Sequence, residues 1–264
     1  NNLSRETNLN LEYGLSYIDQ KNDPFQKSSD VIDFKTKFGW QFHKAWYLTA
    51  AAGFQSQFAY GRAYDGTEAD DPIISKFLSP SYTDISVGID WKPNNIFSLY
   101  LSPIAGKITT AYVGDAVEKD NPGLREQMQE KYGTWAYVKD SNEKKYTNCK
   151  AELGLNFKGS INYTYKDLKI ITTLGLFTPY AWDKKEVHDA EGKFAGYRDN
   201  NRRFGNFDVD WDAAISYQFL KCLNVTLSTS LKYYNGVKIA DKDGISAERV
   251  QFKGILGLGV GYSF

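Results

Sequence analysis

The end of the chain alternates between apolar and polar residues. From Arg249 to Phe264 the even positions are apolar except for Gly254, and the odd positions are polar or glycine except for Ile255. Successive side chains of a β-strand point to opposite faces, so this stretch predicts a strand with one apolar and one polar face. It is longer than the usual strand of about five or six residues. A strand that crosses a bilayer at a tilt needs about nine to eleven residues, which this stretch supplies.

The same alternation recurs throughout the chain and predicts ten such strands. They are expected to cover residues 7–19, 30–42, 46–60, 83–92, 96–113, 149–165, 168–182, 204–219, 223–234 and 249–264. The alternation fails between residues 103 and 107, at Pro103. Because proline cannot donate a hydrogen bond to a strand ladder, we expect a β-bulge there.

The links between these strands alternate in length. Short links occur at His43, Asn94, Lys166 and Lys221, and longer links occur around Lys21, Asp65, Glu118, Glu186 and Asp241. Outer-membrane barrels have short periplasmic turns and longer extracellular loops. The predicted fold class is therefore all-β: residues 1–264 form a single domain, a closed antiparallel transmembrane β-barrel with both termini on the periplasmic side. A soluble β-sandwich is the alternative, but it would expose a large apolar patch to water.

The longest link, residues 114–147, is expected to be an extracellular loop with a short helix. Asn121 and Pro122 precede the helix, which we expect at residues 123–131, because proline is favoured at the start of a helix. The helix is polar, so we expect it to lie exposed on the surface. Three placements stay open for this loop: inside the barrel as a plug, over its mouth, or against another protein.

Aromatic residues are abundant, with 19 Tyr, 16 Phe and 6 Trp in the chain. Barrels carry two girdles of aromatic side chains on the outer face, one at each membrane interface. The expected girdle residues are Trp40, Trp46, Trp91, Tyr165, Tyr217, Tyr262 and Phe264 at the short-link end, and Tyr60, Tyr180, Trp182 and Tyr233 at the other end.

Charge and hydropathy narrow the class of protein further. The formal net charge is zero, whereas a nucleic-acid-binding domain is usually basic, so nucleic acid is not an expected partner. A membrane-spanning helix needs about eighteen or more apolar residues in a row, and the sequence has no such run, so no transmembrane helix is expected.

The face opposite the apolar one carries charges of both signs. The expected lumen-lining charges are Glu12, Asp33, Lys35, Lys37, Asp84, Asp90, Lys92, Lys107, Lys150, Glu152, Lys158, Asp208, Asp210, Asp212, Lys232, Arg249 and Lys253. A small barrel can be filled by its own side chains, so a plug of ion pairs is the first interpretation. The second is a narrow pore with a charged lining. The aspartates at 208, 210 and 212 are expected to be neutralised by Lys232 rather than to bind a metal.

Catalytic and metal-binding chemistry finds little support in the sequence. Nucleophilic catalysis needs a serine or cysteine beside a base, but His43 lies at a short link and His188 in a long loop, so we expect no enzyme and no cofactor. Residues 241–244 and 65–71 are acidic loops for which a plain turn is favoured over a calcium site. Cys149 and Cys222 are expected at opposite rims, too far apart for a disulfide.

Several short motifs resemble those of a known family. They are FLSPSY at residues 77–82, GIDWKP at 88–93, FSLYLSP at 97–103, GK at 106–107, LGLFTPY at 174–180 and VDW at 209–211. In these motifs the chain resembles a Bacteroidota outer-membrane barrel family known as domain of unknown function 3078. The resemblance implies an integral outer-membrane barrel without an assigned activity. It also implies an upstream hairpin, Asn-Trp followed by glycines, so the barrel would have twelve strands with this sequence starting late.

The sequence supports two candidate functions. The first is a non-enzymatic structural or partner-binding component of the bacterial outer membrane, with a lumen filled by charges. The alternative is a narrow channel for passive or selective passage of small polar solutes. The expected partners are outer-membrane lipid and lipopolysaccharide, with another outer-membrane or surface protein as a further candidate.

Overall fold

The structure is a computed structural model that describes residues 2–19, 24–62, 73–137, 143–180, 186–188, 190–197, 204–220, 222–235, 237–240 and 246–260. Within this part of the chain, no helix is long and apolar enough to cross a membrane.

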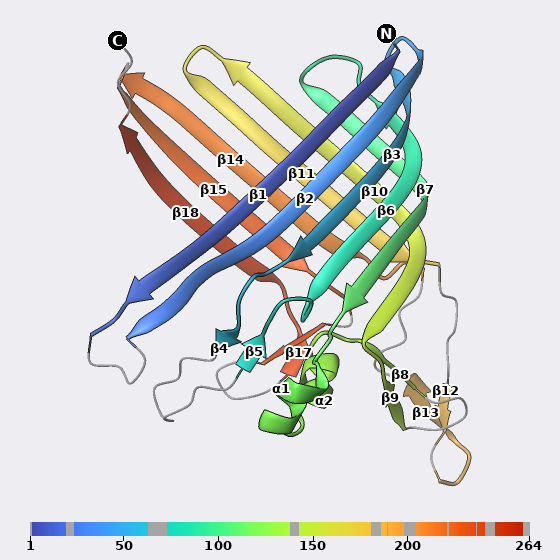
Figure 1. Cartoon of the computed structure of the whole chain (residues 1–264). Helices are drawn as coiled ribbons and strands as arrows, with labels where there is room; N and C mark the ends of the chain where they lie inside the picture. Colours follow the sequence, from blue (N-terminus) through green and yellow to red (C-terminus); the bar gives the residue numbers. More distant parts are fainter. Residues whose placement is uncertain are drawn as a thin grey trace.

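Ten long strands of the described residues form one antiparallel sheet (Figure 1). In sheet order, the strands are β1 (Leu3–Tyr17), β2 (Phe25–His43), β3 (Trp46–Ser56), β6 (Ser81–Trp91), β7 (Phe97–Thr110), β10 (Cys149–Tyr165), β11 (Leu168–Pro179), β14 (Asp208–Leu220), β15 (Leu223–Tyr233) and β18 (Gln251–Val260). Each strand pairs with its neighbour in this order, so β1 and β18 are the edge strands of the described sheet. The sheet curves strongly, and in Figure 1 β1 and β2 pass in front of β14, β15 and β18.

The ten strands match the ten predicted from alternation, although several ends differ. β1 begins at Leu3 rather than at residue 7 and pairs with β2 from the register Leu3↔Trp40 onward. β2 begins at Phe25 rather than at residue 30, and β14 begins at Asp208 rather than at residue 204. Strand ends depend on the length of the partner strand as well as on local alternation, which explains these differences.

The bulge expected at Pro103 is confirmed. Ser102 pairs with Asn156 and Ala105 with Gly154, so two residues of β7 stand opposite one residue of β10. The bulge brings the backbone of β7 close to Gly88 of β6, where a Cβ atom would lie 2.2 Å from the carbonyl oxygen of Leu101. A side chain does not fit at this position, which explains why β6 carries a glycine there.

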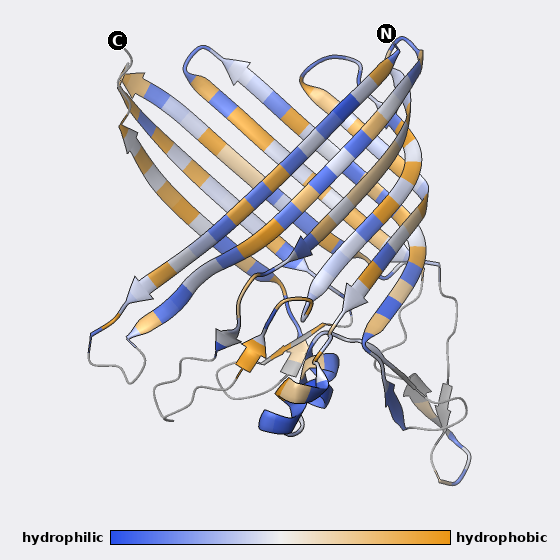
Figure 2. Ribbon diagram, viewed as in Figure 1, coloured by the Kyte–Doolittle hydropathy of each residue, from blue (hydrophilic) through white to orange (hydrophobic). Residues whose placement is uncertain are grey.

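The burial pattern of the sheet is the reverse of that in a water-soluble protein. Apolar strand residues such as Leu11, Phe38 and Leu256 are exposed. Figure 2 shows hydrophobic and hydrophilic residues alternating along the strands as orange and blue segments. Polar strand residues are buried instead: Thr49, Ser86, Asp90, Ser102, Thr178 and Asp208. The convex face is therefore apolar and the concave face polar, as the alternation predicts.

The short links lie at one end of the sheet, and small elements gather at the other end (Figure 1). These elements are β4 (Gly61–Arg62), β5 (Ile73–Ser75), α1 (Asp115–Asp120), α2 (Leu124–Lys131), β8 (Trp135–Tyr137), β9 (Lys144–Tyr146), β12 (Glu186–His188), β13 (Phe194–Tyr197), β16 (Lys238–Ala240) and β17 (Ser246–Glu248). β1 begins and β18 ends at the short-link end. The expected helix is α2, and the expected loop also contains α1 and the β8–β9 pair.

Candidate functional site

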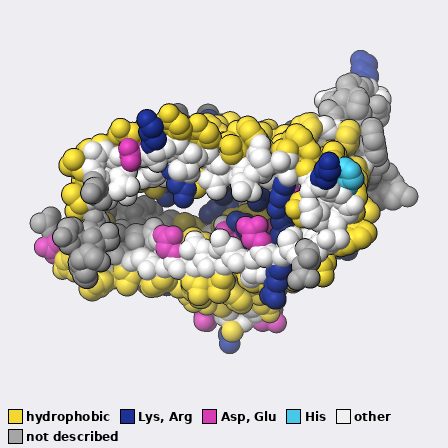
Figure 3. Space-filling view, turned by 90° about the horizontal axis from the view of Figure 1, so that it is seen from above, with side chains coloured by type: hydrophobic (Ala, Val, Ile, Leu, Met, Phe, Trp, Pro, Cys, Tyr) yellow, Lys and Arg dark blue, Asp and Glu magenta, His cyan; other side chains and the backbone are white. Residues whose placement is uncertain are grey.

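The concave face of the sheet encloses a polar hollow. Figure 3 looks into it from the short-link end: Lys, Arg, Asp and Glu side chains line the hollow, whereas hydrophobic side chains dominate the outside. The charged positions predicted from the sequence alternate with the exposed apolar positions, so they share this concave face. The geometry of their contacts decides whether these charges fill the hollow or leave it open.

At the short-link end, two lysines converge on one aspartate. Asp90 is fully buried on β6, and its Oδ2 accepts from Lys37 and lies 3.3 Å from the Nζ of Lys92. Its Oδ1 accepts a hydrogen bond of 2.9 Å from the hydroxyl of Ser98. A buried carboxylate is costly unless it is paired and hydrogen-bonded, and the two lysines and the Ser98 hydroxyl satisfy both requirements.

A cavity adjoins this aspartate. Its volume is about 300 Å³, and its lining includes Glu6, Lys37, Tyr47, Thr49 and Lys92 as well as Asp90. Lys92 lies 5.6 Å from the ring centre of Tyr47, close enough for a cation–π contact. The hollow is therefore not filled at this end.

Toward the other end, a second ion pair crosses the concave face. Lys107 of β7 donates to Asp208 of β14 at 2.6 Å, although β10 and β11 lie between these strands in the sheet. The aromatic rings of Phe177 and Tyr234 lie 5.7 and 5.0 Å from the lysine Nζ. The backbone N–H of Asn235 donates to the other oxygen of Asp208 at 2.9 Å. This end of the hollow is therefore crossed by side chains.

The rest of the aspartate ladder is only partly neutralised. Lys232 lies 3.7 Å from Asp210, as predicted, and the hydroxyl of Tyr234 donates to Asp210 at 2.6 Å. Burial, and then the charge of Asp210, raises the pKa of Tyr234, so its hydroxyl stays protonated and able to donate. Asp212 is exposed within the hollow. Asp208 pairs with Lys107 and not with the predicted Lys232.

Alternating charges also stand side by side on neighbouring strands. One register row runs from Lys35 through Gly53 to Asp84, and continues to Lys107 and Glu152. A Cβ at Gly53 would lie 2.3 Å from Oδ1 of Asp84, so the carboxylate lies over the glycine. Opposite charges at directly opposed positions stabilise a sheet, and this row places them on both sides of the glycine.

Other predicted charges contact residues of their own strand or of the neighbouring strand. Lys35 pairs with Asp33 of the same strand at 2.7 Å, and Lys150 lies 3.7 Å from Glu152 of its own strand. Glu12 accepts from the hydroxyl of Ser29 on the neighbouring strand. Lys158, Arg249 and Lys253 are the remaining predicted charges; Arg249 lies just before β18, and Lys158 and Lys253 lie within β10 and β18.

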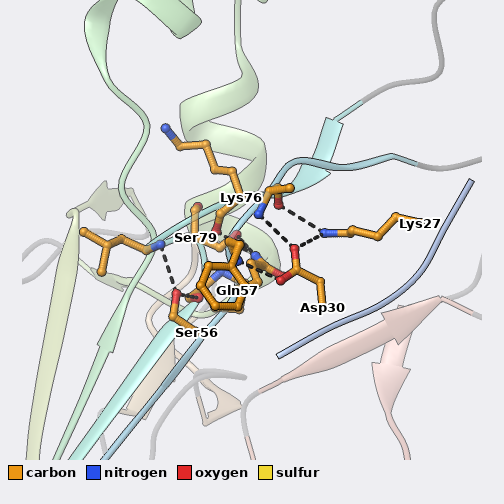
Figure 4. Close-up of polar contacts among 10 residues, drawn as sticks. Lys27, Asp30, Ser56, Gln57, Lys76 and Ser79 are labelled. Atoms are coloured by element: carbon orange, nitrogen blue, oxygen red, sulfur yellow. Dashed lines mark hydrogen bonds and ion pairs between the residues drawn. The ribbon is translucent and has the colours of Figure 1, made fainter. Parts of the chain in front are cut away.

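The junction between the sheet and the long links is tied by a polar network (Figure 4). The Asp30 carboxylate accepts from Lys27 at 2.8 Å and from the backbone N–H groups of Phe58 and Ala59 at 2.8 and 2.9 Å. The side chain of Gln57 donates to the carbonyl oxygens of Lys76 and Ser79 at 2.7 and 3.0 Å. The sequence did not predict this network, because most of its hydrogen bonds join a side chain to a backbone group distant in the chain.

Helix α2 packs against the sheet end rather than lying exposed, so the expectation of a surface helix is wrong. Leu124 and Met128 are buried against Ile73, Ala111 and Val113. We call α1, α2 and these three packing residues the cap. The overall polarity of the helix is misleading, because two apolar residues four positions apart share one face and are enough to dock it.

Hydrogen bonds fix the cap in place. The hydroxyl of Tyr132 donates to the carbonyl oxygen of Ile74 at 2.7 Å. Burial raises the pKa of Tyr132, and the neighbouring Tyr82 raises it further. Arg125 donates to the carbonyl oxygen of Val113 at 3.2 and 3.0 Å and pairs with Asp115 at 2.6 Å. The cap therefore has both an apolar core and a polar frame.

The residues of the expected aromatic girdles that the structure describes lie near the two ends of the sheet. Trp46 and Trp91 stand 6.2 Å apart at the short-link end, where Trp40, Tyr165 and Tyr217 are exposed. At the other end Tyr60 is exposed, Tyr180 stacks on Phe204 at 6.2 Å, and Tyr233 donates to Glu248 at 3.1 Å. The predicted girdle residues Trp182, Tyr262 and Phe264 lie outside the described residues.

Sulfur and histidine positions agree with the predicted ends of the strands. Cys149 begins β10, Cys222 lies in the link between β14 and β15, and both are free and exposed. His43 ends β2 and His188 ends β12. In the part of the chain that the structure describes, no three His, Cys, Asp or Glu side chains form a group that could hold a metal ion. The acidic stretches at 65–71 and 241–244 lie outside the described residues.

The fold defines a curved, ten-stranded antiparallel sheet with an apolar convex face and a charged concave face. Residues 1–61 match a family model described as Protein of unknown function (DUF3078). The resemblance to that family is thus confirmed for β1, β2 and β3, whereas the short motifs that suggested it lie between residues 77 and 211. No curated protein matches the chain.

Proposed function

We propose that this chain is a non-enzymatic, integral β-barrel protein of the bacterial outer membrane. The observation that carries the proposal is the reversed burial of the sheet: large apolar side chains are exposed on the convex face, and buried strand positions are polar. In water this surface would be a large apolar patch, whereas lipid would cover it. The short links would face the periplasm and the cap would lie outside the cell.

Closure of the sheet is part of this proposal. Lipid cannot hydrogen-bond a strand edge, so a barrel in a membrane has no open edge. Successive strands alternate in direction, and β1 and β18, first and tenth in sheet order, therefore run in opposite directions. An antiparallel barrel then closes either by direct pairing of these two strands or by an even number of strands between them.

We propose that the barrel is structural or binds a partner through its outer end, with its lumen closed at that end. Support comes from the buried Asp208 of the concave face, which is paired with Lys107 toward that end, and from the cap packed at the long-link end. The resemblance to a Bacteroidota outer-membrane family fits this location. Outer-membrane lipid and lipopolysaccharide would contact the convex face.

The membrane location is tested by expressing the protein in a Gram-negative host and fractionating the cells. We expect the protein in the outer-membrane fraction, released only by detergent, with a gel mobility that changes on heating. Recovery of the intact folded protein from the aqueous fraction without detergent would contradict the proposal.

The second candidate is a narrow channel, which is favoured by the cavity of about 300 Å³ beside Asp90. Recordings in a planar bilayer distinguish the two functions. A closed lumen gives no steady current at modest voltage, whereas a channel gives a steady open current. Purification of a stoichiometric partner from native membranes would support the first function over a solitary pore.

A further inference from the structure

The ion pair between Lys107 and Asp208 joins strands that are not adjacent in the sheet, unlike three other ion pairs of the concave face. Lys35–Asp33 and Lys150–Glu152 each lie within one strand, and Lys232–Asp210 joins adjacent strands. Lys107 and Asp208 belong to β7 and β14, and their contact passes over β10 and β11. The pair therefore holds together two parts of the sheet that have no backbone hydrogen bonds to each other.

The surroundings of the pair leave little freedom to its groups. The side chains of Lys107 and Asp208 are only 18% and 3% exposed. One oxygen of Asp208 binds Lys107, and the other binds the backbone N–H of Asn235. The rings of Phe177 and Tyr234 flank the lysine, and Tyr234 is itself held by Asp210.

The same cluster continues to the cap. Tyr82 of β6 lies within electrostatic range of Asp208 and Asp210, and Tyr132, at the end of α2, lies within range of Tyr82. The hydroxyl of Tyr132 in turn donates to the carbonyl oxygen of Ile74 in β5. Tyr132, Tyr82 and the Lys107–Asp208 pair thus form a series of electrostatic neighbours at the long-link end of the hollow.

We infer that the Lys107–Asp208 pair, with the rings of Phe177 and Tyr234, is the seal that closes the lumen to ions at its outer end. The inference rests on the proposed barrel and names the groups that keep it closed. A buried charge left without its partner attracts water strongly, so loss of either residue would hydrate this constriction. The open cavity at the periplasmic end would then connect to the outside.

Single-channel recording of the purified, bilayer-reconstituted protein tests the seal. The variants Asp208→Asn and Lys107→Met each keep the approximate shape of the side chain while removing its charge. We expect the wild type to pass no steady current and each variant to pass a steady current at least about tenfold above the wild-type baseline. The double variant K107D/D208K restores the pair in reverse and should return the current toward baseline.

The matched control removes a pair that does not cross the concave face. Lys35→Met breaks the contact with Asp33, which lies on the same strand, and should leave the current at the wild-type level. Each variant is used only after heat-dependent gel mobility shows that it is folded.

The possible results separate the seal from the function on which it rests. A steady current through the wild type would overturn the closed lumen itself. A silent wild type with equally silent, folded Asp208→Asn and Lys107→Met variants would overturn the seal and leave the proposed function standing. An opening of the same size in Lys35→Met would also overturn the seal, since it would show that any lost charge opens the lumen.

Discussion

The sheet and the cap place apolar side chains on opposite sides. In the sheet, Phe38, Trp211 and Leu256 are exposed while Asp90 and Ser102 are buried. In the cap, Leu124 and Met128 are buried against Ile73, and Asp115 is fully exposed. The cap is built like a small water-soluble core, whereas the sheet exposes its large apolar side chains on the convex face. The sheet therefore buries polar side chains and the cap buries apolar ones, and the two regions meet where the strands end.

The difference also appears in the spacing of the residues. Exposed apolar positions of the sheet recur at every second residue, as in Leu9, Leu11, Tyr13 and Leu15 of β1. The buried positions of α2 are four residues apart, as in Leu124 and Met128. Spacing shows which residues share a face, but it does not show whether that face meets lipid, water or protein. Substitutions at matched positions can show which of these three each face contacts.

The largest effect is expected in the cap core. Met128 is only 1% exposed, and Met128→Ala leaves a cavity beside Leu124 and Ile73. Such truncations cost about 2–5 kcal/mol. Amide hydrogens of α1, α2 and residues 111–113 should exchange faster, while those of the ten strands keep their protection. The control Met128→Leu, which conserves volume, should cost less than about 1.5 kcal/mol. Faster exchange throughout the sheet would contradict the independence of the two regions.

The next effect separates the two faces of the sheet. Leu227 and Ser228 are neighbours near the middle of β15; Leu227 is exposed on the convex face and Ser228 faces the hollow. If lipid covers the convex face, Leu227→Arg should lower the free energy of unfolding by about 2–4 kcal/mol. Ser228→Arg should cause a clearly smaller loss. Denaturant titration of the protein in bilayers measures the loss of unfolding free energy in both variants. Equal losses would contradict the assignment of lipid to the convex face.

The alternation of residues was sufficient to predict the strands, the two faces and the bulge. Each of these depends on neighbours close in sequence, as at Pro103, where a missing donor interrupts the ladder. The burial of α2 was not predictable in the same way, since Met128 needs Ile73 and Ala111, which are distant in the chain.

The candidate site was predicted only in part for a related reason. Alternation placed Lys107 and Asp208 on one face, but not against each other, because the contact depends on how tightly the sheet curves between β7 and β14. Lys232 was the expected partner because it stands opposite Asp210 on the adjacent strand. Adjacent-strand partners follow from register, whereas partners across a curved face need the three-dimensional structure.

A moderate effect is expected at the junction of the two regions. The Asp30 carboxylate accepts from the N–H groups of Phe58 and Ala59, so Asp30→Ala leaves two backbone donors without this acceptor. An unsatisfied donor costs about 1–3 kcal/mol where it is buried; because these two donors are exposed or half-buried, we expect a loss of about 1 kcal/mol. Amide exchange should accelerate at residues 57–62 and 73–80 but not in α2. The control Asp33→Ala removes a carboxylate from the same strand outside this network and should leave those residues protected. Unchanged exchange in Asp30→Ala would show that the network does not hold the junction.

The smallest effect is expected on the outer surface near the cap. Glu130 binds Lys144 at 2.6 Å and the hydroxyl of Tyr146 at 3.1 Å, and all three groups are at the surface. Because water screens such a pair, Glu130→Gln should cost only about 0–1 kcal/mol. The loss should shrink further at high salt, where the ion pair is weakened in the wild type as well. Exchange of α2 amides at low and high salt measures it. A loss as large as that of Met128→Ala would mean that surface charges, rather than the buried residues of α2, hold the cap to the sheet.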